Sequence, residues 1–111
     1  MKKINIVKKN EDYNRIIQNF KPYKYKDYIV YIEWVSENSY HFGFSVGKKI
    51  GNAVTRNRIK RQIKSILDKL VFKNGFNCII IVKRGILEKS FSDMQRDLLE
   101  LIEKIKITKE S

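Results

Sequence analysis

A group of cations within one short stretch carries the strongest chemical signal in this sequence. Between residues 38 and 67 there is neither Asp nor Glu. The cations of this window are Lys48, Lys49, Arg56, Arg58, Lys60, Arg61 and Lys64. Arginine guanidinium groups hold phosphate oxygens bidentately, and lysine ammonium groups act as point charges. The stretch therefore predicts a surface that binds a polyanion such as the phosphate backbone of a nucleic acid.

A single predicted helix carries most of these cations. Asn52 is its expected N-cap, and the helix is expected to run to about Leu70. At about 100° per residue the apolar residues fall on one arc, which consists of Ile59, Ile63, Ile66, Leu67 and Leu70. The polar residues spread over the remainder, which consists of Arg56, Asn57, Arg58, Lys60, Arg61 and Lys64. We expect the apolar arc to pack on a sheet, so that the polar arc faces outwards.

The lack of acids separates this helix from an ordinary solvated basic face. Exposed helices commonly mix signs, because opposite charges four residues apart stabilise them. Asn57 lies among the cations, where its amide can donate to a phosphate and accept from a 2′-hydroxyl. The preceding loop, residues 47–51, adds Lys48 and Lys49 but lacks the spacing of a Walker phosphate loop.

The sequence shows no catalytic or metal-binding constellation. His41 is the only histidine, so a His-based acid–base pair or a multi-His metal site is excluded. Cys78 is the only cysteine and stands in an apolar run, which indicates an inert core thiol. No pair of acids marks a metal-dependent nuclease site. If the protein serves a nuclease, we expect another component to perform the chemistry.

The bulk composition limits the classes of protein that fit. The chain has 111 residues, which suffices for one domain spanning residues 1–111. It carries a net charge of +12 and has a pI near 9.9, and such an excess favours a polyanionic partner. No apolar run of about eighteen residues could cross a bilayer, and no signal peptide is recognisable at the N-terminus. We therefore expect a cytoplasmic, soluble protein.

The remaining elements follow from periodicity and turn signals. A first helix is expected from Asn10, with Tyr13 and Ile17 on its apolar face, and Pro22 ends it. Residues 28–35 and 40–46 read as strands that should form an antiparallel hairpin. Residues 76–82 predict a central strand buried on both faces, and Ser90 is the expected cap of a last helix. The order α-β-β-α-β-α indicates an α+β fold, an α/β sandwich in which one sheet carries packed helices.

Residues 44–61 closely resemble the protein subunit of bacterial ribonuclease P, and Arg-Asn-Arg-Ile-Lys-Arg at 56–61 matches that family's signature. Residues 8–13 are similar to its opening helix, and residues 78–84 are similar to its fourth strand. The resemblance implies the fold α-β-β-β-α-β-α, with one short strand more than the pattern indicates. It also implies a single mixed sheet with a left-handed crossover around the basic helix.

The resemblance also implies a function. In this family a catalytic RNA removes the 5′ leader of precursor tRNA by endonucleolytic hydrolysis, with magnesium ions held mainly by that RNA. The protein is implied to be a monomer, one per catalytic RNA, that assists without being catalytic or binding a cofactor by itself. The residues implied to bind the catalytic RNA are Lys48, Lys49, Asn52, Arg56, Asn57, Arg58, Lys60, Arg61 and Lys64. The residues implied to line a cleft for the leader are Tyr13, Ile17 and Tyr31.

Two positions depart from the family pattern, and two other readings of the basic helix stay open. Ile17 stands where a second cleft aromatic is common, and Lys64 stands where arginine is frequent. The first alternative is a stand-alone nucleic-acid-binding module, although no helix-turn-helix pair precedes the basic helix. The second is a peripheral membrane protein whose basic amphipathic helix lies on anionic lipid.

Overall fold

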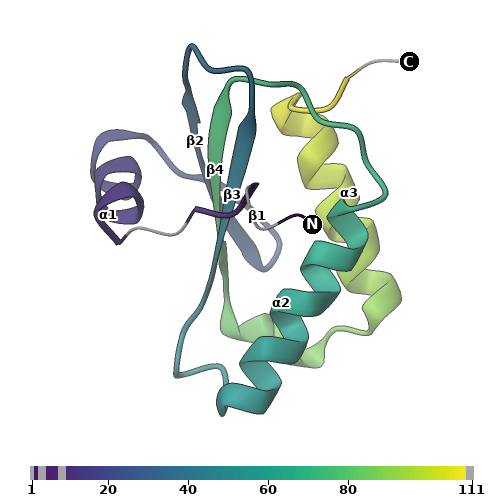
Figure 1. Ribbon diagram of the computed structural model, residues 1–111. Coiled ribbons are helices and arrows are strands. Elements are labelled where there is room, and N and C mark those ends of the chain that lie inside the picture. Colours follow the sequence, from purple (N-terminus) through teal and green to yellow (C-terminus); the bar gives the residue numbers. More distant parts are fainter. Residues whose placement is uncertain (1, 3–4, 8–9, 110–111) are drawn as a thin grey trace.

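The computed structural model describes residues 2, 5–7 and 10–109 (Figure 1). Its helices and strands follow the order implied by the resemblance, including the additional short strand. The elements are α1 (Asn10–Asn19), β1 (Tyr23–Tyr25), β2 (Tyr28–Trp34), β3 (Tyr40–Val46), α2 (Ala53–Leu67), β4 (Phe76–Val82), the 3-10 helix η2 (Arg84–Glu88) and α3 (Phe91–Ile105). The expected match of residues 8–13 to an opening helix is described only from Asn10, because residues 8 and 9 lie outside the described part.

The four strands form one mixed sheet in the order β1-β2-β4-β3. β4 pairs antiparallel with β2 and parallel with β3, so it lies between the two. The expected hairpin of β2 and β3 is therefore wrong. The physical reason is the composition of β4, whose side chains apart from Asn77 are apolar on both faces and are best covered at the centre of the sheet. Its predicted span and central position are confirmed.

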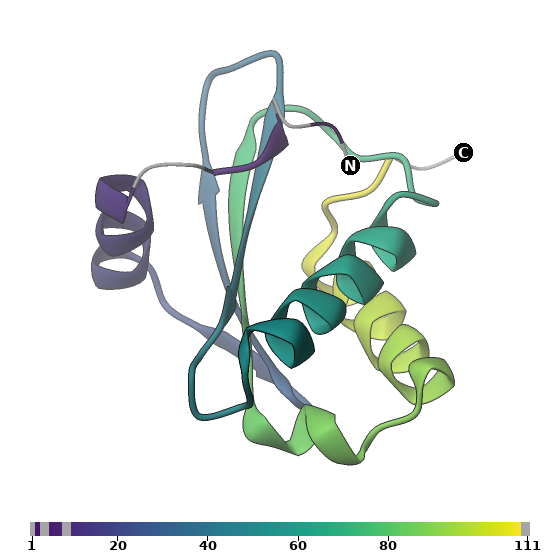
Figure 2. The same cartoon turned by 60° about the horizontal axis from the view of Figure 1, so that its bottom comes forward.

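α2 connects the parallel strands β3 and β4 and lies on one face of the sheet beside α3, whereas α1 lies on the other face (Figures 1 and 2). The left hand expected for this connection stays a prediction. Side chains alternate along β4, so that Ile80 faces α2 and α3 while Ile79 faces α1. Both side chains are completely buried, as a strand covered on two sides requires.

The larger core fills the space between the sheet and the α2–α3 layer. Its aromatic part is a cluster of rings from β3, β4 and the segment before β4, in which Phe42 contacts Phe72 and Phe76 edge to face. Cys78 is fully buried in this core, and burial raises the pKa of its thiol. The predicted core location of this thiol is therefore confirmed.

Local capping fixes the helix starts that the sequence indicated. The Asn52 side chain accepts a hydrogen bond from the Thr55 backbone N–H at 2.9 Å, and Ser90 accepts one from Asp93 at 3.1 Å. α2 ends at Leu67, three residues before the expected end. The cause is a tighter turn, since the Leu70 N–H bonds to the Leu67 carbonyl three residues back, at 3.0 Å.

Candidate nucleic-acid interface

The division of α2 into an apolar and a polar face is confirmed. Ile63 and Leu67 are fully buried, and Ile59 and Ile66 nearly so. On the opposite side the polar residues reach the surface to different extents. Asn57, Arg58 and Arg61 are exposed, whereas Arg56, Lys60 and Lys64 are half-buried. The three exposed side chains are therefore those most accessible to a polyanion.

No acid neutralises the α2 cations within the described residues. The ion pairs found there involve Arg15, Lys89 and Arg96, all outside α2 and its preceding loop. Lys64 instead holds its ammonium group 5.8 Å from the centre of the Phe44 ring, a cation–π contact with the sheet. The positive charges of α2 are therefore not neutralised by ion pairs with described acids and remain available to a polyanion.

The loop before α2 extends this basic surface. Lys48 and Lys49 are exposed there, as is Asn52. The side-chain oxygen Oδ1 of Asn52 already caps the helix. The NH₂ group of the same side chain therefore remains to donate to a ligand. Arg56 keeps a buried Nε without a hydrogen-bond partner, so its outward capacity rests on the terminal nitrogens of the guanidinium.

The predicted leader residues gather on the opposite face of the sheet, where they form the α1-side cluster: Tyr13, Ile17 and Tyr31. They pack around the buried residues Ile16 and Ile79. The strand register places Tyr31 level with Ile79 and Gly43, so one row crosses the sheet beneath α1. Burial raises the pKa of the Tyr13 hydroxyl, and a hydrogen bond with the Phe44 backbone opposes that shift.

A polar network that the sequence did not predict borders the α1-side cluster. In the next row of the sheet Glu33, Asn77 and His41 lie side by side. The side-chain NH₂ of Asn77 donates to Glu33 at 2.8 Å, and His41 Nδ1 lies 2.9 Å from the side-chain oxygen of Asn77. Arg15 of α1 forms an ion pair with Glu33. The network connects α1 to three strands of the sheet, β2, β4 and β3. The only hint in the sequence was an acid within an otherwise β-branched and aromatic strand.

Removal of the Glu33 carboxylate should loosen this attachment of α1. Glu33 is only 7% exposed, and it accepts from both Arg15 and Asn77. We expect Glu33→Ala to lower the free energy of unfolding by about 1–3 kcal/mol, the usual cost of lost hydrogen bonds to a charged group. Urea unfolding would measure the loss. Glu37→Ala, at an exposed acid nearby, should change stability by less than about 0.5 kcal/mol; an equal loss there would contradict the network's role.

Comparison with known proteins agrees with this geometry. The family model described as Ribonuclease P matches residues 1–106. The chain belongs to the bacterial ribonuclease P protein family. The ribonuclease P protein component of Mycoplasma capricolum subsp. capricolum is 38% identical over 109 residues, which cover 96% of this chain and 100% of that protein.

Solved ribonuclease P proteins share the fold. The Staphylococcus aureus protein, solved at 2.0 Å, superposes with a TM-score of 0.85 at 27% identity, over 95% of this chain and 98% of that one. The Thermotoga maritima ribonuclease P protein gives a TM-score of 0.80 over 90% of this chain and 96% of that one. At 23% identity this second likeness concerns the fold alone.

Membership of the ribonuclease P protein family establishes the general function. The chain is a subunit of the ribonuclease P holoenzyme, an endoribonuclease of tRNA maturation, and it assists the RNA subunit in forming the 5′ end.

The membrane alternative does not fit, because the apolar arc of α2 is buried in the core. Within the described residues, none of the helices is long and apolar enough to span a bilayer. The same residues contain no cluster of three or more His, Cys, Asp or Glu that could hold a metal ion.

Proposed function

We propose that the outward face of α2 and the loop before it hold the catalytic RNA of ribonuclease P. The observation that carries this proposal is the row of cations without an acidic partner in the described structure. The proposed contacts are Lys48, Lys49, Asn52, Arg56, Asn57, Arg58, Lys60, Arg61 and Lys64. Of these, Asn57, Arg58 and Arg61 are the most exposed on α2 and should contribute most.

The α1-side cluster is the proposed contact for the 5′ leader of precursor tRNA. Unpaired bases stack on aromatic side chains, and Tyr13 and Tyr31 offer two rings on this face. Ile17 supplies apolar contact at the position where the family commonly has a second aromatic. The two sites lie on opposite faces of one sheet, so catalytic RNA and leader can be held at the same time.

These two proposed sites give the protein a binding role and leave catalysis to the RNA subunit. The RNA subunit performs the hydrolysis, with magnesium ions that it mainly holds itself, and the protein alone is not catalytic. One monomer, folded as a single domain over residues 1–111, serves one catalytic RNA in the cytoplasm. Magnesium-dependent cleavage by highly purified protein without RNA would contradict this assignment.

A reconstitution assay with Tyr31→Ala tests the assistance of cleavage and the proposed leader site. Precursor tRNA is incubated with catalytic RNA at low magnesium, with and without the protein. The unaltered protein should accelerate cleavage at the mature 5′ end. Tyr31→Ala should weaken binding of leader-bearing precursor by about 1–3 kcal/mol, the usual contribution of one stacked base, and leave mature tRNA unaffected.

Tyr23→Ala is the matched control, because Tyr23 is an exposed tyrosine on the edge strand β1 and points to the other side of the sheet. It should behave like the unaltered protein. An equal loss for precursor and mature tRNA would contradict leader binding at the α1-side cluster. Equal affinity of the unaltered protein for duplex DNA and catalytic RNA would instead favour a general nucleic-acid-binding module.

A further inference from the structure

His41 lies on the α1 face of the sheet, one row beyond the α1-side cluster. Alternate residues of a strand point to the same face, so His41 and Gly43 share a face and stand about 7 Å apart along β3. The ring of Tyr13 fills the space above Gly43, because a Cβ atom at that glycine would lie 2.6 Å from it. The imidazole of His41 therefore borders the proposed leader contact.

The polar network determines which ring nitrogen of His41 carries the proton. The Glu33 carboxylate, which forms an ion pair with Arg15, only accepts hydrogen bonds, so the Asn77 atom that faces it at 2.8 Å is the side-chain NH₂. The side-chain oxygen of Asn77 then faces His41 Nδ1 at 2.9 Å, and an amide oxygen also only accepts. Nδ1 is therefore the donor, which leaves Nε2 of the neutral ring as an acceptor.

The Nε2 atom of His41 is both unpartnered and accessible. It has no hydrogen-bond partner among the described residues. Within the same residues Arg56 Nε is the only buried side-chain nitrogen or oxygen that lacks a partner. Because His41 Nε2 also lacks one, it is not buried, and the half-buried ring presents it to solvent. Three strands and α1 thus orient an acceptor that no described group of the protein uses.

We propose that His41 Nε2 accepts a hydrogen bond from one nucleotide of the 5′ leader, which deepens and rests on the proposed leader site. Phosphate oxygens only accept, so the neutral Nε2 atom needs a donor on the sugar or on the base. The donor is a ribose 2′-hydroxyl or an exocyclic amino group. The contact adds recognition of an individual leader group to the stacking on Tyr13 and Tyr31.

His41→Asn tests the proposal because it removes Nε2 and keeps the network. The amide of Asn branches at the same Cγ atom as the imidazole, so its NH₂ can take the place of Nδ1–H towards Asn77. We expect the affinity of the holoenzyme for leader-bearing precursor to fall roughly 2- to 12-fold, the usual range for one hydrogen bond between neutral groups. Mature tRNA should bind as before, and urea unfolding should show a folded protein.

Precursors that carry one altered leader nucleotide identify the donor. One series replaces single riboses by 2′-deoxyribose, and a second series replaces single bases by analogues that lack the exocyclic amino group. At one position the altered nucleotide should weaken binding of the unaltered protein but cause no further loss in His41→Asn, because the two changes remove the same hydrogen bond. Such coupling in the first series assigns the ribose, and coupling in the second assigns the base.

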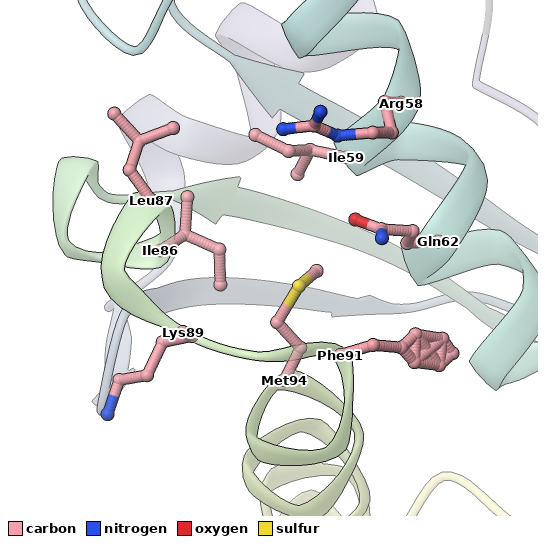
Figure 3. A pocket seen from close by; sticks show the side chains of 8 residues that line it. All are labelled: Arg58, Ile59, Gln62, Ile86, Leu87, Lys89, Phe91 and Met94. Atoms are coloured by element: carbon pink, nitrogen blue, oxygen red, sulfur yellow. The ribbon is translucent and has the colours of Figure 1, made fainter.

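Gln62→Ala is the matched control. Gln62 is also half-buried and also lacks a hydrogen-bond partner among the described residues. It extends from α2 towards the pocket between α2, η2 and α3 (Figure 3). That pocket lies on the face of the sheet opposite to α1. Gln62→Ala should therefore leave the ratio of precursor affinity to mature tRNA affinity unchanged.

The outcomes separate this inference from the proposal on which it rests. If Tyr31→Ala weakens precursor binding while His41→Asn does not, the contact with His41 is overturned and the leader site remains. Losses that simply add at every leader position, or an equal loss for precursor and mature tRNA in His41→Asn, would overturn it as well. If neither variant changes the ratio of the two affinities, the proposed leader site is wrong and this inference is wrong with it.

Discussion

Alanine at both Arg58 and Arg61 is expected to produce the largest loss of affinity for the catalytic RNA, and to flatten the salt dependence of binding by about two units. Each guanidinium that leaves a phosphate lowers the number of released counterions, which reduces the slope by about one. Both side chains are exposed on α2, so their removal should leave the core intact. With about six to ten phosphate contacts, the unaltered protein should lose roughly 10³–10⁵ in affinity between 50 and 200 mM salt.

Filter binding or fluorescence anisotropy across this salt range measures both quantities. Lys73→Ala with Lys109→Ala is the matched control, because it removes the same charge from exposed positions outside α2. An equal flattening by the control would mean that total charge, rather than the α2 face, determines binding. Loss of helix in circular dichroism would show that the two arginines support the fold instead.

Gly43→Ala should have the largest effect on the α1-side cluster. A Cβ atom at Gly43 would lie 2.6 Å from the Tyr13 ring and its hydroxyl, and 2.7 Å from Ile79 Cδ1. Contacts this short cannot persist, and Ile79 is completely buried, so the Tyr13 ring must shift. We expect a loss of about 1–3 kcal/mol in unfolding free energy, typical of overpacking. The displaced ring should also weaken binding of leader-bearing precursor.

Gly47→Ala is the control, since nothing lies within 4 Å of a Cβ atom at that position. It should leave stability and leader binding near those of the unaltered protein. Denaturant unfolding and precursor titration would measure the two effects of Gly43→Ala separately. Unchanged leader binding in a measurably destabilised Gly43→Ala protein would show that Tyr13 does not contribute to the leader site.

Local signals in the sequence predicted the elements that depend on local physics. The cap at Asn52, the apolar arc with Ile63 and the span of β4 follow from capping and periodicity, and the structure confirms each. The short strand β1 has only three residues and too little pattern to be recognised without the family resemblance.

Features that depend on strand pairing could not be predicted from the sequence pattern. Two amphipathic strands joined by a short polar turn satisfy the rules for a hairpin equally well whether or not a third strand separates them. The row that contains Glu33, Asn77 and His41 exists only because β4 lies between β2 and β3.

The central position of β4 also determines when the domain can form during synthesis. β2 and β3 emerge from the ribosome first, but they do not pair with each other and must wait for residues 76–82. α2 is completed in this interval, and its apolar arc has no finished sheet to cover it. Folding therefore depends on contacts distant in sequence, which slows it and leaves strand edges exposed meanwhile. The basic surface is thus assembled late, as a product of nearly the whole chain.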